Sequence, residues 1–206
     1  GQSIAESAAE LAATMPDVYR TWPTTIDRMV FVAHSMGGLV VTRALHIPAS
    51  TDTAWHTSVT DVLTLGSPFE GAPLERVSDR ALRAMATSPT VAPIAELGHL
   101  RSQGIKDLGP GIAHDVPAGI RHHAIVAMLG DSHEALPSVA LGDGIVPVSS
   151  ARHRRVDSAA DSQHLPTTSH LDLLDDAEVT VALSGILRTN ESSTLMPDER
   201  PASQSH

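Results

Sequence analysis

The sequence predicts an α/β fold with a mostly parallel sheet, and three short apolar runs are the main indication. β-Branched and aliphatic side chains dominate residues 28–33, 59–65 and 121–129, as they do in strands buried inside a parallel sheet. Helical patterns separate these runs: one covers residues 3–14, and LVVTRALHI follows the first run up to Pro48. Strands that alternate with helices in this way form parallel sheets with helices packed on their faces.

The chain is expected to form one domain followed by a tail. An amphipathic helix over residues 171–188 is expected to end the domain, which then covers residues 1–188. Residues 189–206 are rich in Ser, Pro and Glu and lack apolar periodicity, so this tail is predicted to be disordered.

Composition excludes several classes of function. The formal net charge of -10 argues against binding to nucleic acid or to an anionic membrane surface, and no apolar run is long enough to span a bilayer. The absence of cysteine excludes disulfides, thiolate nucleophiles and cysteine-ligated metals. The histidines show no spacing such as H-E-x-x-H, so we expect neither a metal nor another cofactor.

The segment FVAHSMGGLVV indicates a nucleophile elbow, in which a serine occupies a sharp turn between a buried strand and a helix. Small residues are needed two positions before and two after the serine, and Ala33 and Gly37 occupy these positions around Ser35. The pattern is therefore A-x-S-x-G rather than the commoner G-x-S-x-G. Ser35 is the predicted nucleophile, and the N–H of Met36 is a predicted oxyanion donor. His34 is expected to pack beside the elbow and not to act as the base.

Two aspartates are candidates for the catalytic acid, which follows the serine and precedes the histidine in hydrolases with this elbow. Asp143 lies between two glycines in LGDGIVPVSSA, where an Asp-Gly turn presents a carboxylate from a loop tip. Asp131, in LGDSHEAL, directly follows the third apolar run. Position favours Asp131, whereas local sequence favours Asp143, which we take as the predicted acid.

His170 is the predicted base among the 12 histidines. It lies in TTSHLDLL, a polar segment that opens directly into the last predicted helix, where the order of the three residues requires the histidine. His153 and His164 also follow Asp143 but do not lie at such a junction. His122 and His123 begin a predicted strand and are expected to be surface or core residues.

Five segments together resemble bacterial α/β-hydrolases related to GPI inositol-deacylases and triacylglycerol lipases: AHSMGGLVVTRAL, LGSPFEGAPLER, GIKDLG, GDGIVPVSSA and SHLDLL. The resemblance extends from about Ile26 to Arg188. It implies the α/β-hydrolase fold, hydrolysis of a small-molecule or lipid carboxylic ester by Ser35, Asp143 and His170, and a cap-like insert over about 72–120.

The sequence departs from this pattern at its beginning. In the α/β-hydrolase fold a second oxyanion donor comes from a loop that precedes the elbow strand. Residues 1–34 contain one predicted helix and a short connector, so we expect the N-terminal strands and that loop to be missing, as in a truncated member.

The sequence therefore predicts a serine esterase or lipase that works through an acyl-enzyme. Peptidase and acyltransferase chemistry uses the same three residues. The alternative from another class is a catalytically impaired α/β-hydrolase remnant that serves as a binding or interaction module.

Overall fold

The computed structural model of the chain describes residues 2–48, 54–71, 114–130, 142–152 and 162–193. These residues belong to two compact units whose boundary falls between Leu173 and Leu174. The first unit contains the sheet, and the second contains the helix α10, Ala177–Ser193.

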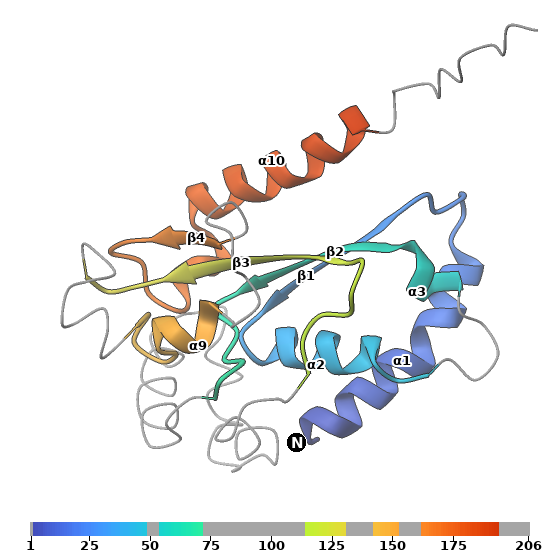
Figure 1. Cartoon of the computed structure of the whole chain (residues 1–206), viewed down its shortest axis with the longest axis horizontal. Helices are drawn as coiled ribbons and strands as arrows, with labels where there is room; N and C mark the ends of the chain where they lie inside the picture. The colour runs from blue at the N-terminus through green and yellow to red at the C-terminus, as the bar shows by residue number, and fades with distance from the viewer. Residues whose placement is uncertain (1, 49–53, 72–113, 131–141, 153–161, 194–206) are drawn as a thin grey trace, which may run out of the picture. The chain divides into compact units, whose positions relative to one another are not determined.

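Four parallel strands form the sheet of the first unit (Figure 1). They are β1 (Met29–His34), β2 (Val59–Leu65), β3 (Arg121–Ala127) and β4 (Ser162–Leu165), and they lie side by side in chain order. The three predicted strands are confirmed, and so is the predicted α/β class with a mostly parallel sheet. Strand β4 was not predicted, because SQHL is short and mostly polar and forms no apolar run.

Helix α1 (Ile4–Thr21) is longer than predicted. A capping box begins it: the Ser3 hydroxyl accepts from the Glu6 N–H at 3.1 Å, and the Glu6 carboxylate accepts from the Ser3 N–H at 2.7 Å. The expected end before Pro16 is wrong, since the helix continues through that proline. Pro16 removes one backbone hydrogen bond, but residues on both sides of it pack on the core beside Val41, namely Leu11, Ala12, Met15 and Tyr19.

Helices α1, α2 (Met36–Leu45) and α9 (Val148–Arg152) lie on one face of the sheet (Figure 1). Helix α2 packs on β1 and β2, α9 packs on β3, and α1 packs on α2 and on the short α3 (Ala54–Ser58).

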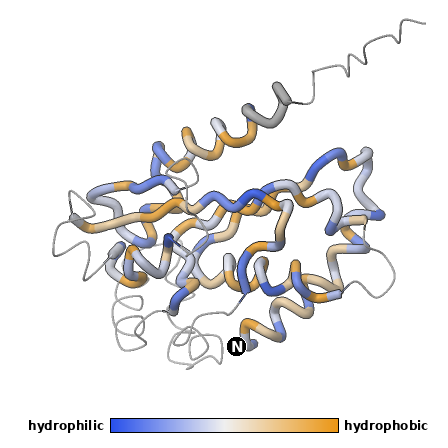
Figure 2. Tube along the Cα trace, in the orientation of Figure 1, coloured by the Kyte–Doolittle hydropathy of each residue, from blue (hydrophilic) through white to orange (hydrophobic). Residues whose placement is uncertain are grey.

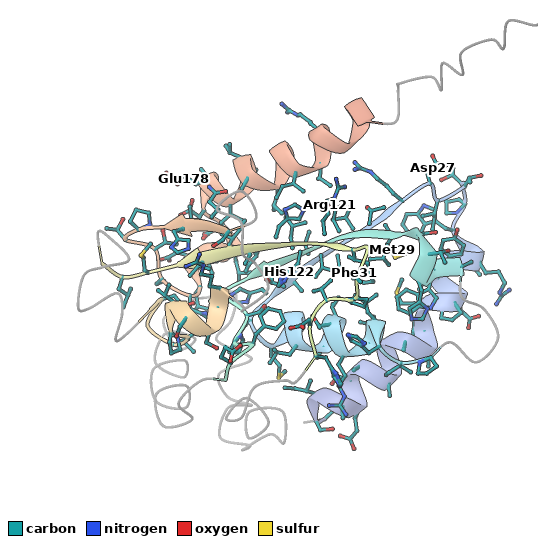
Figure 3. The ribbon with its side chains drawn as sticks, in the orientation of Figure 1. Asp27, Met29, Phe31, Arg121, His122 and Glu178 are labelled. Carbon is teal, nitrogen blue, oxygen red and sulfur yellow. The ribbon has the colours of Figure 1, made fainter. Side chains whose placement is uncertain are left out.

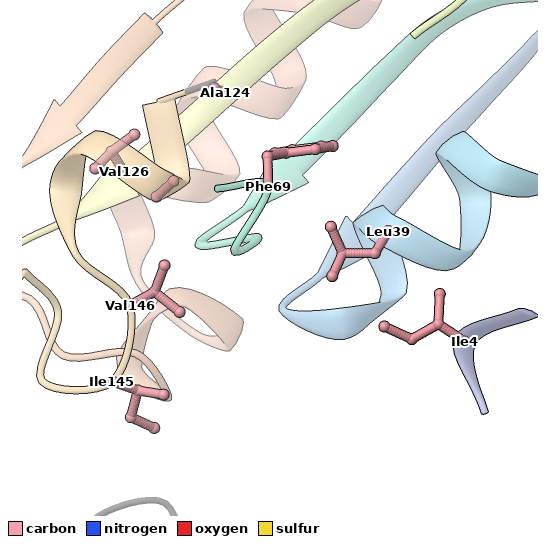
Figure 4. Packing of buried hydrophobic residues seen from close by; sticks show 8 residues of the cluster. Ile4, Leu39, Phe69, Ala124, Val126, Ile145 and Val146 are labelled. Carbon is pink, nitrogen blue, oxygen red and sulfur yellow. The ribbon is translucent and has the colours of Figure 1, made fainter. Parts of the chain in front are cut away.

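Two groups of buried side chains fill the space between these layers. One joins α1 and α2 to the loops after β2 and before α9, and Figure 4 shows Ile4, Leu39, Phe69 and Val146 from this group. The other gathers around Trp55, which is 1% exposed.

Strand β1 is an edge strand of the described sheet and pairs with β2. The expectation that it is buried on both faces is wrong, since Val32 is 52% exposed and most of the strand is half-buried. One face of the strand packs on the core group around Trp55 through Met29, Phe31 and Ala33, and these contacts explain much of its apolar composition. The connection from α1 into β1, over residues 22–28, is largely hydrophilic (Figure 2). Among the described residues before β1 there is no strand.

Helix α10 begins six residues later than the predicted helix over 171–188. A 3-10 turn, Asp172–Leu174, comes first, and the Asp176 carboxylate then accepts from the Glu178 N–H at 2.7 Å, which caps the new helix. The helix extends to Ser193, beyond the predicted start of the tail. The rest of that tail and residues 72–113 of the predicted insert lie outside the described residues.

A buried carboxylate ties β2 to β3 near the start of both strands. The Asp61 side chain is 0% exposed; its oxygens accept from the Arg121 guanidinium at 2.9 and 3.0 Å and contact His123 Nε2 at 2.9 Å. Arg121 lies on the opposite side of the sheet from His122 (Figure 3), as neighbours in a strand do. Burial alone raises the pKa of Asp61, but the hydrogen bonds from Arg121, Thr60 and His123 outweigh it, so the pKa falls below its ordinary value.

Replacing this carboxylate is expected to make the stability of the fold less dependent on pH. Asp61→Asn should lower the free energy of unfolding by about 2 kcal/mol at pH 7, because Arg121 loses its ionic partner. Since the pKa of Asp61 is lowered by folding, its contribution is present above the unfolded-state value of about 3.9 and is lost as the pH falls through the folded-state value. In urea unfolding, the difference between wild type and variant should therefore shrink below about pH 4.

Asp17→Asn is the matched control, because that carboxylate pairs with Arg20 at 2.7 Å on the exposed surface of α1. Its effect should stay below about 1 kcal/mol. A destabilisation by Asp61→Asn that is equally large at pH 7 and pH 3 would contradict the ion pair.

The first turn of α2 packs tightly against the loop that follows β2. A Cβ atom added at Gly38 would lie 2.7 Å from the Ser67 Cβ, and the Ser67 side chain is fully buried. A Cβ atom added at Gly37 would meet only the Ala33 Cβ, at an ordinary 3.8 Å. A single methyl group therefore fits at Gly37, in line with the predicted need for a small residue there, whereas Gly38 has no room for one.

These two glycines provide a matched pair of substitutions in one helical turn. Gly38→Ala should destabilise the fold by about 1–3 kcal/mol through overpacking, whereas Gly37→Ala should be neutral or stabilising by up to about 1 kcal/mol through helix propensity. Thermal unfolding measures both, and Ser67→Gly should restore part of the stability lost in Gly38→Ala. Equal stability of the two alanine variants would show that Gly38 and Ser67 are not packed as described.

Candidate active site

Ser35 occupies the turn between β1 and α2, at the position predicted for the elbow. Its backbone is left-handed, with φ 53° and ψ -128°, a conformation that costs a residue other than glycine about 1–3 kcal/mol. Two hydrogen bonds hold the turn: the Ser35 N–H donates to the Leu65 carbonyl at 2.9 Å, and the Gly38 N–H donates to the Ser35 carbonyl at 3.1 Å. The Ser35 hydroxyl does not cap α2, so the side chain is available for other contacts.

Met36 begins α2 directly after this turn. The first N–H groups of a helix have no partner within the helix, and the helix dipole makes this end positive. The N–H of Met36 is thus next to Ser35, at a helix end that favours negative charge.

Asp143 and His170, the predicted acid and base, form a buried hydrogen-bonded pair. Their exposed fractions are 2% and 4%, and the distance from His170 Nδ1 to Asp143 Oδ2 is 2.6 Å. Because a carboxylate only accepts, the proton of this hydrogen bond belongs to Nδ1. In the neutral imidazole Nε2 then carries the lone pair, which is the form in which a histidine can accept a proton.

The backbone around Asp143 fixes the other carboxylate oxygen. Oδ1 accepts from the N–H groups of Ile145 and Val146, at 3.0 and 2.8 Å, within the Asp-Gly turn that the sequence predicted. The carbonyl of Asp143 also accepts from the backbone N–H of His170, at 3.0 Å. Asp143 therefore uses Oδ1 to hold its own turn, and Oδ2 and its backbone carbonyl to hold His170.

The Asp143–His170 pair lies close to the end of β2, which is hydrogen-bonded to Ser35 through Leu65. A Cβ atom added at Gly66, the residue after Leu65, would lie 2.9 Å from Asp143 Oδ2 and 3.1 Å from His170 Nδ1. Gly66 has φ 57°, so glycine both tolerates the backbone and leaves room for the pair. No local feature of the sequence indicates this packing at Gly66, because Asp143 and His170 are distant from it in the chain.

His34 contacts the predicted base directly. Its Nε2 lies 2.9 Å from the His170 carbonyl oxygen, and the centroids of the two imidazole rings are 4.7 Å apart. His34 packs beside the elbow as expected, and its hydrogen bond to His170 could not be predicted from the sequence.

The other candidate acid and bases are placed elsewhere or not described. Asp131 and His153 lie outside the described residues. Three further histidines contact side chains of their own or neighbouring strands: His122 with Thr64, His123 with Asp61, and His164 with Ser162.

Neither a metal site nor a membrane span is found in the part of the chain that the structure describes. Its His, Asp and Glu side chains form no group of three or more that could hold a metal ion. Its helices include none with the length and apolar character needed to cross a bilayer.

Comparison with known proteins shows which families and structures this chain resembles. A model of the family described as the PGAP1-like alpha/beta domain matches residues 4–92. No curated protein matches the chain.

Several solved structures are similar. The mature lipase BlEst2 of Bacillus licheniformis is 18% identical with a TM-score of 0.58, and the match covers 90% of this chain and 74% of the lipase. The product of the gene lin2722 of Listeria innocua is 20% identical, with a TM-score of 0.54 and coverage of 96% and 70%. A thermophilic esterase is 15% identical, with a TM-score of 0.56 and coverage of 92% and 74%. The chain therefore has the α/β-hydrolase fold, and its predicted resemblance to lipases and esterases of that fold is confirmed.

Proposed function

We propose that this chain is a carboxylic ester hydrolase with Ser35 as nucleophile, His170 as base and Asp143 as acid. The observation that carries the proposal is the buried hydrogen bond between Asp143 and His170 beside the left-handed turn at Ser35. A serine on such a turn, with a histidine whose Nδ1 donates to a carboxylate, is the arrangement that activates a hydroxyl for attack on an acyl group. The similar lipase and esterase support an ester as the substrate.

In the first half of the reaction, the Ser35 oxygen attacks the carbonyl carbon of the ester while its proton passes to His170 Nε2. The carbonyl oxygen becomes an oxyanion, toward which the N–H of Met36 donates. The tetrahedral intermediate then collapses: the bond to the alkoxy oxygen breaks, and that oxygen takes the proton from Nε2 and leaves as an alcohol. Ser35 retains the acyl group.

In the second half, water attacks the acyl-enzyme and gives a proton to His170 Nε2. That proton returns to Ser35 as the carboxylic acid leaves, so the site is regenerated. Asp143 accepts from Nδ1 throughout, which keeps the imidazole in the required tautomer and stabilises the transient imidazolium.

A second candidate function is a binding or interaction module with little or no catalysis. One observation bears on it: among the described residues, a single backbone N–H at a helix N-terminus, that of Met36, directly follows Ser35. Loss of one oxyanion donor lowers turnover by about 10²–10³. Labelling by a fluorophosphonate separates the two functions, because it requires an activated serine.

Ser35→Ala is expected to abolish both fluorophosphonate labelling and turnover of a short p-nitrophenyl ester, because the nucleophilic oxygen is removed. The fold should persist, since the two hydrogen bonds of the turn are made by backbone atoms. Labelling is read by in-gel fluorescence and stability by thermal unfolding. Labelling that persists in this variant would contradict the assignment of Ser35 as the nucleophile.

Asp143→Asn is expected to lower kcat by about 10²–10⁴ with little change in KM, because the imidazole loses its tautomer control. Asp131→Asn is the informative counterpart, since sequence alone left that residue as the alternative acid, and it should retain wild-type kcat. Steady-state kinetics on the p-nitrophenyl ester measures both. The reverse pattern would assign the acid to Asp131.

A further inference from the structure

The predicted base is held at three points, and one of them comes from the strand that carries the nucleophile. Asp143 binds the backbone N–H of His170 and its Nδ1, at 3.0 and 2.6 Å. The third point is the carbonyl oxygen of His170, which lies 2.9 Å from His34 Nε2. Because His34 and Ser35 are consecutive, this contact links the backbone of the base to the turn that carries the nucleophile.

The chemistry of this contact fixes the proton on His34. A carbonyl oxygen only accepts, so His34 Nε2 carries a hydrogen and donates it. Burial lowers the pKa of His34 and the neighbouring His170 lowers it further, whereas the hydrogen bond to the His170 carbonyl and the charge of Asp143 raise it. The net result is a pKa below the ordinary value, so His34 is neutral at pH 7 and Nδ1 is unprotonated.

Neutrality matters because of the distance between the two rings. Their centroids are 4.7 Å apart, and His170 becomes a cation for part of the proposed reaction. A second cation at this distance would oppose that step, since like charges at short range in a buried site repel strongly. A neutral donor can hold the His170 backbone without this penalty.

We propose that His34 is a positioning residue that sets the separation between the Ser35 hydroxyl and the His170 imidazole by donating from Nε2 to the His170 carbonyl. The inference rests on the proposed function, which needs that separation to be correct for proton transfer. A displacement of about 1 Å in such a pair is enough to lower the rate about 10²-fold.

Two substitutions separate the hydrogen bond from the bulk of the side chain. His34→Gln places an amide N–H at about the reach of Nε2, whereas His34→Leu fills a similar volume without a donor. We expect His34→Leu to lower kcat on a p-nitrophenyl ester by about 10- to 100-fold with KM within about twofold of wild type. His34→Gln should stay within about threefold of wild type, because the donor is restored.

Thermal unfolding of each variant accompanies the kinetics. If His34→Leu does not fold, His34→Asn replaces it, because its amide is too short to reach the carbonyl. Wild-type kcat in the variant that lacks the donor, or a loss in His34→Gln as large as in that variant, would overturn the proposal.

A second readout does not depend on activity, so it separates failure of this inference from failure of the proposed function. Long-range ¹H–¹⁵N NMR spectra of the wild-type chain report which imidazole nitrogen of each histidine is protonated, and His34 is assigned by the signal that His34→Gln lacks. We expect the proton on Nε2. A proton on Nδ1 would overturn the inference, whereas absent fluorophosphonate labelling together with the expected tautomer would count against the hydrolase activity alone.

Discussion

The buried hydrogen bond between Asp143 and His170 requires the surrounding loops to supply further hydrogen-bond donors and to leave space for the two side chains. A carboxylate with 2% exposure needs partners for both oxygens, and it finds them in two backbone N–H groups and one imidazole. The glycine at position 66 leaves the space beside the pair, since any Cβ there would approach the carboxylate and the ring. Three loops, which contain Gly66, Asp143 and His170, therefore meet at this hydrogen bond, and the turn at Ser35 lies beside them.

The parallel sheet explains why these parts meet. Strands that run in the same direction bring their carboxyl ends to one edge, where Ser35 follows β1 and Gly66 follows β2. The hydrogen bond from Ser35 to Leu65 joins these two strand ends, and the one from Met128 to Leu165 joins the ends of β3 and β4. Functional side chains thus lie on loops that a hydrogen-bonded scaffold holds in place.

Much of this arrangement could be predicted from sequence where local pattern decides structure. The three apolar runs gave β1, β2 and β3, and A-x-S-x-G between a strand and a helix gave the turn at Ser35. The pairing of Asp143 with His170 was expected from the order of the three residues along the chain. Other contacts between distant residues could not be predicted, because nothing local to Gly66 or His34 indicates that His170 lies close to either residue. Local rules also failed where tertiary packing competes with them, as in α1, which continues through Pro16 because Met15 and Tyr19 pack on the core. Strand β1 was expected to be central because its composition is apolar, but position in a sheet depends on pairing, which composition does not encode.

The central claim is that this constellation activates Ser35, and the site of covalent reaction tests it most directly. The wild-type chain, treated with a fluorophosphonate and digested with trypsin, yields a peptide over residues 29–43, because Arg28 and Arg43 flank the serine turn. Mass spectrometry should find one phosphonate on this peptide, with fragment ions that place it on Ser35, and no adduct when the chain is denatured before treatment. An adduct on another residue, or none on the folded chain, would contradict the account.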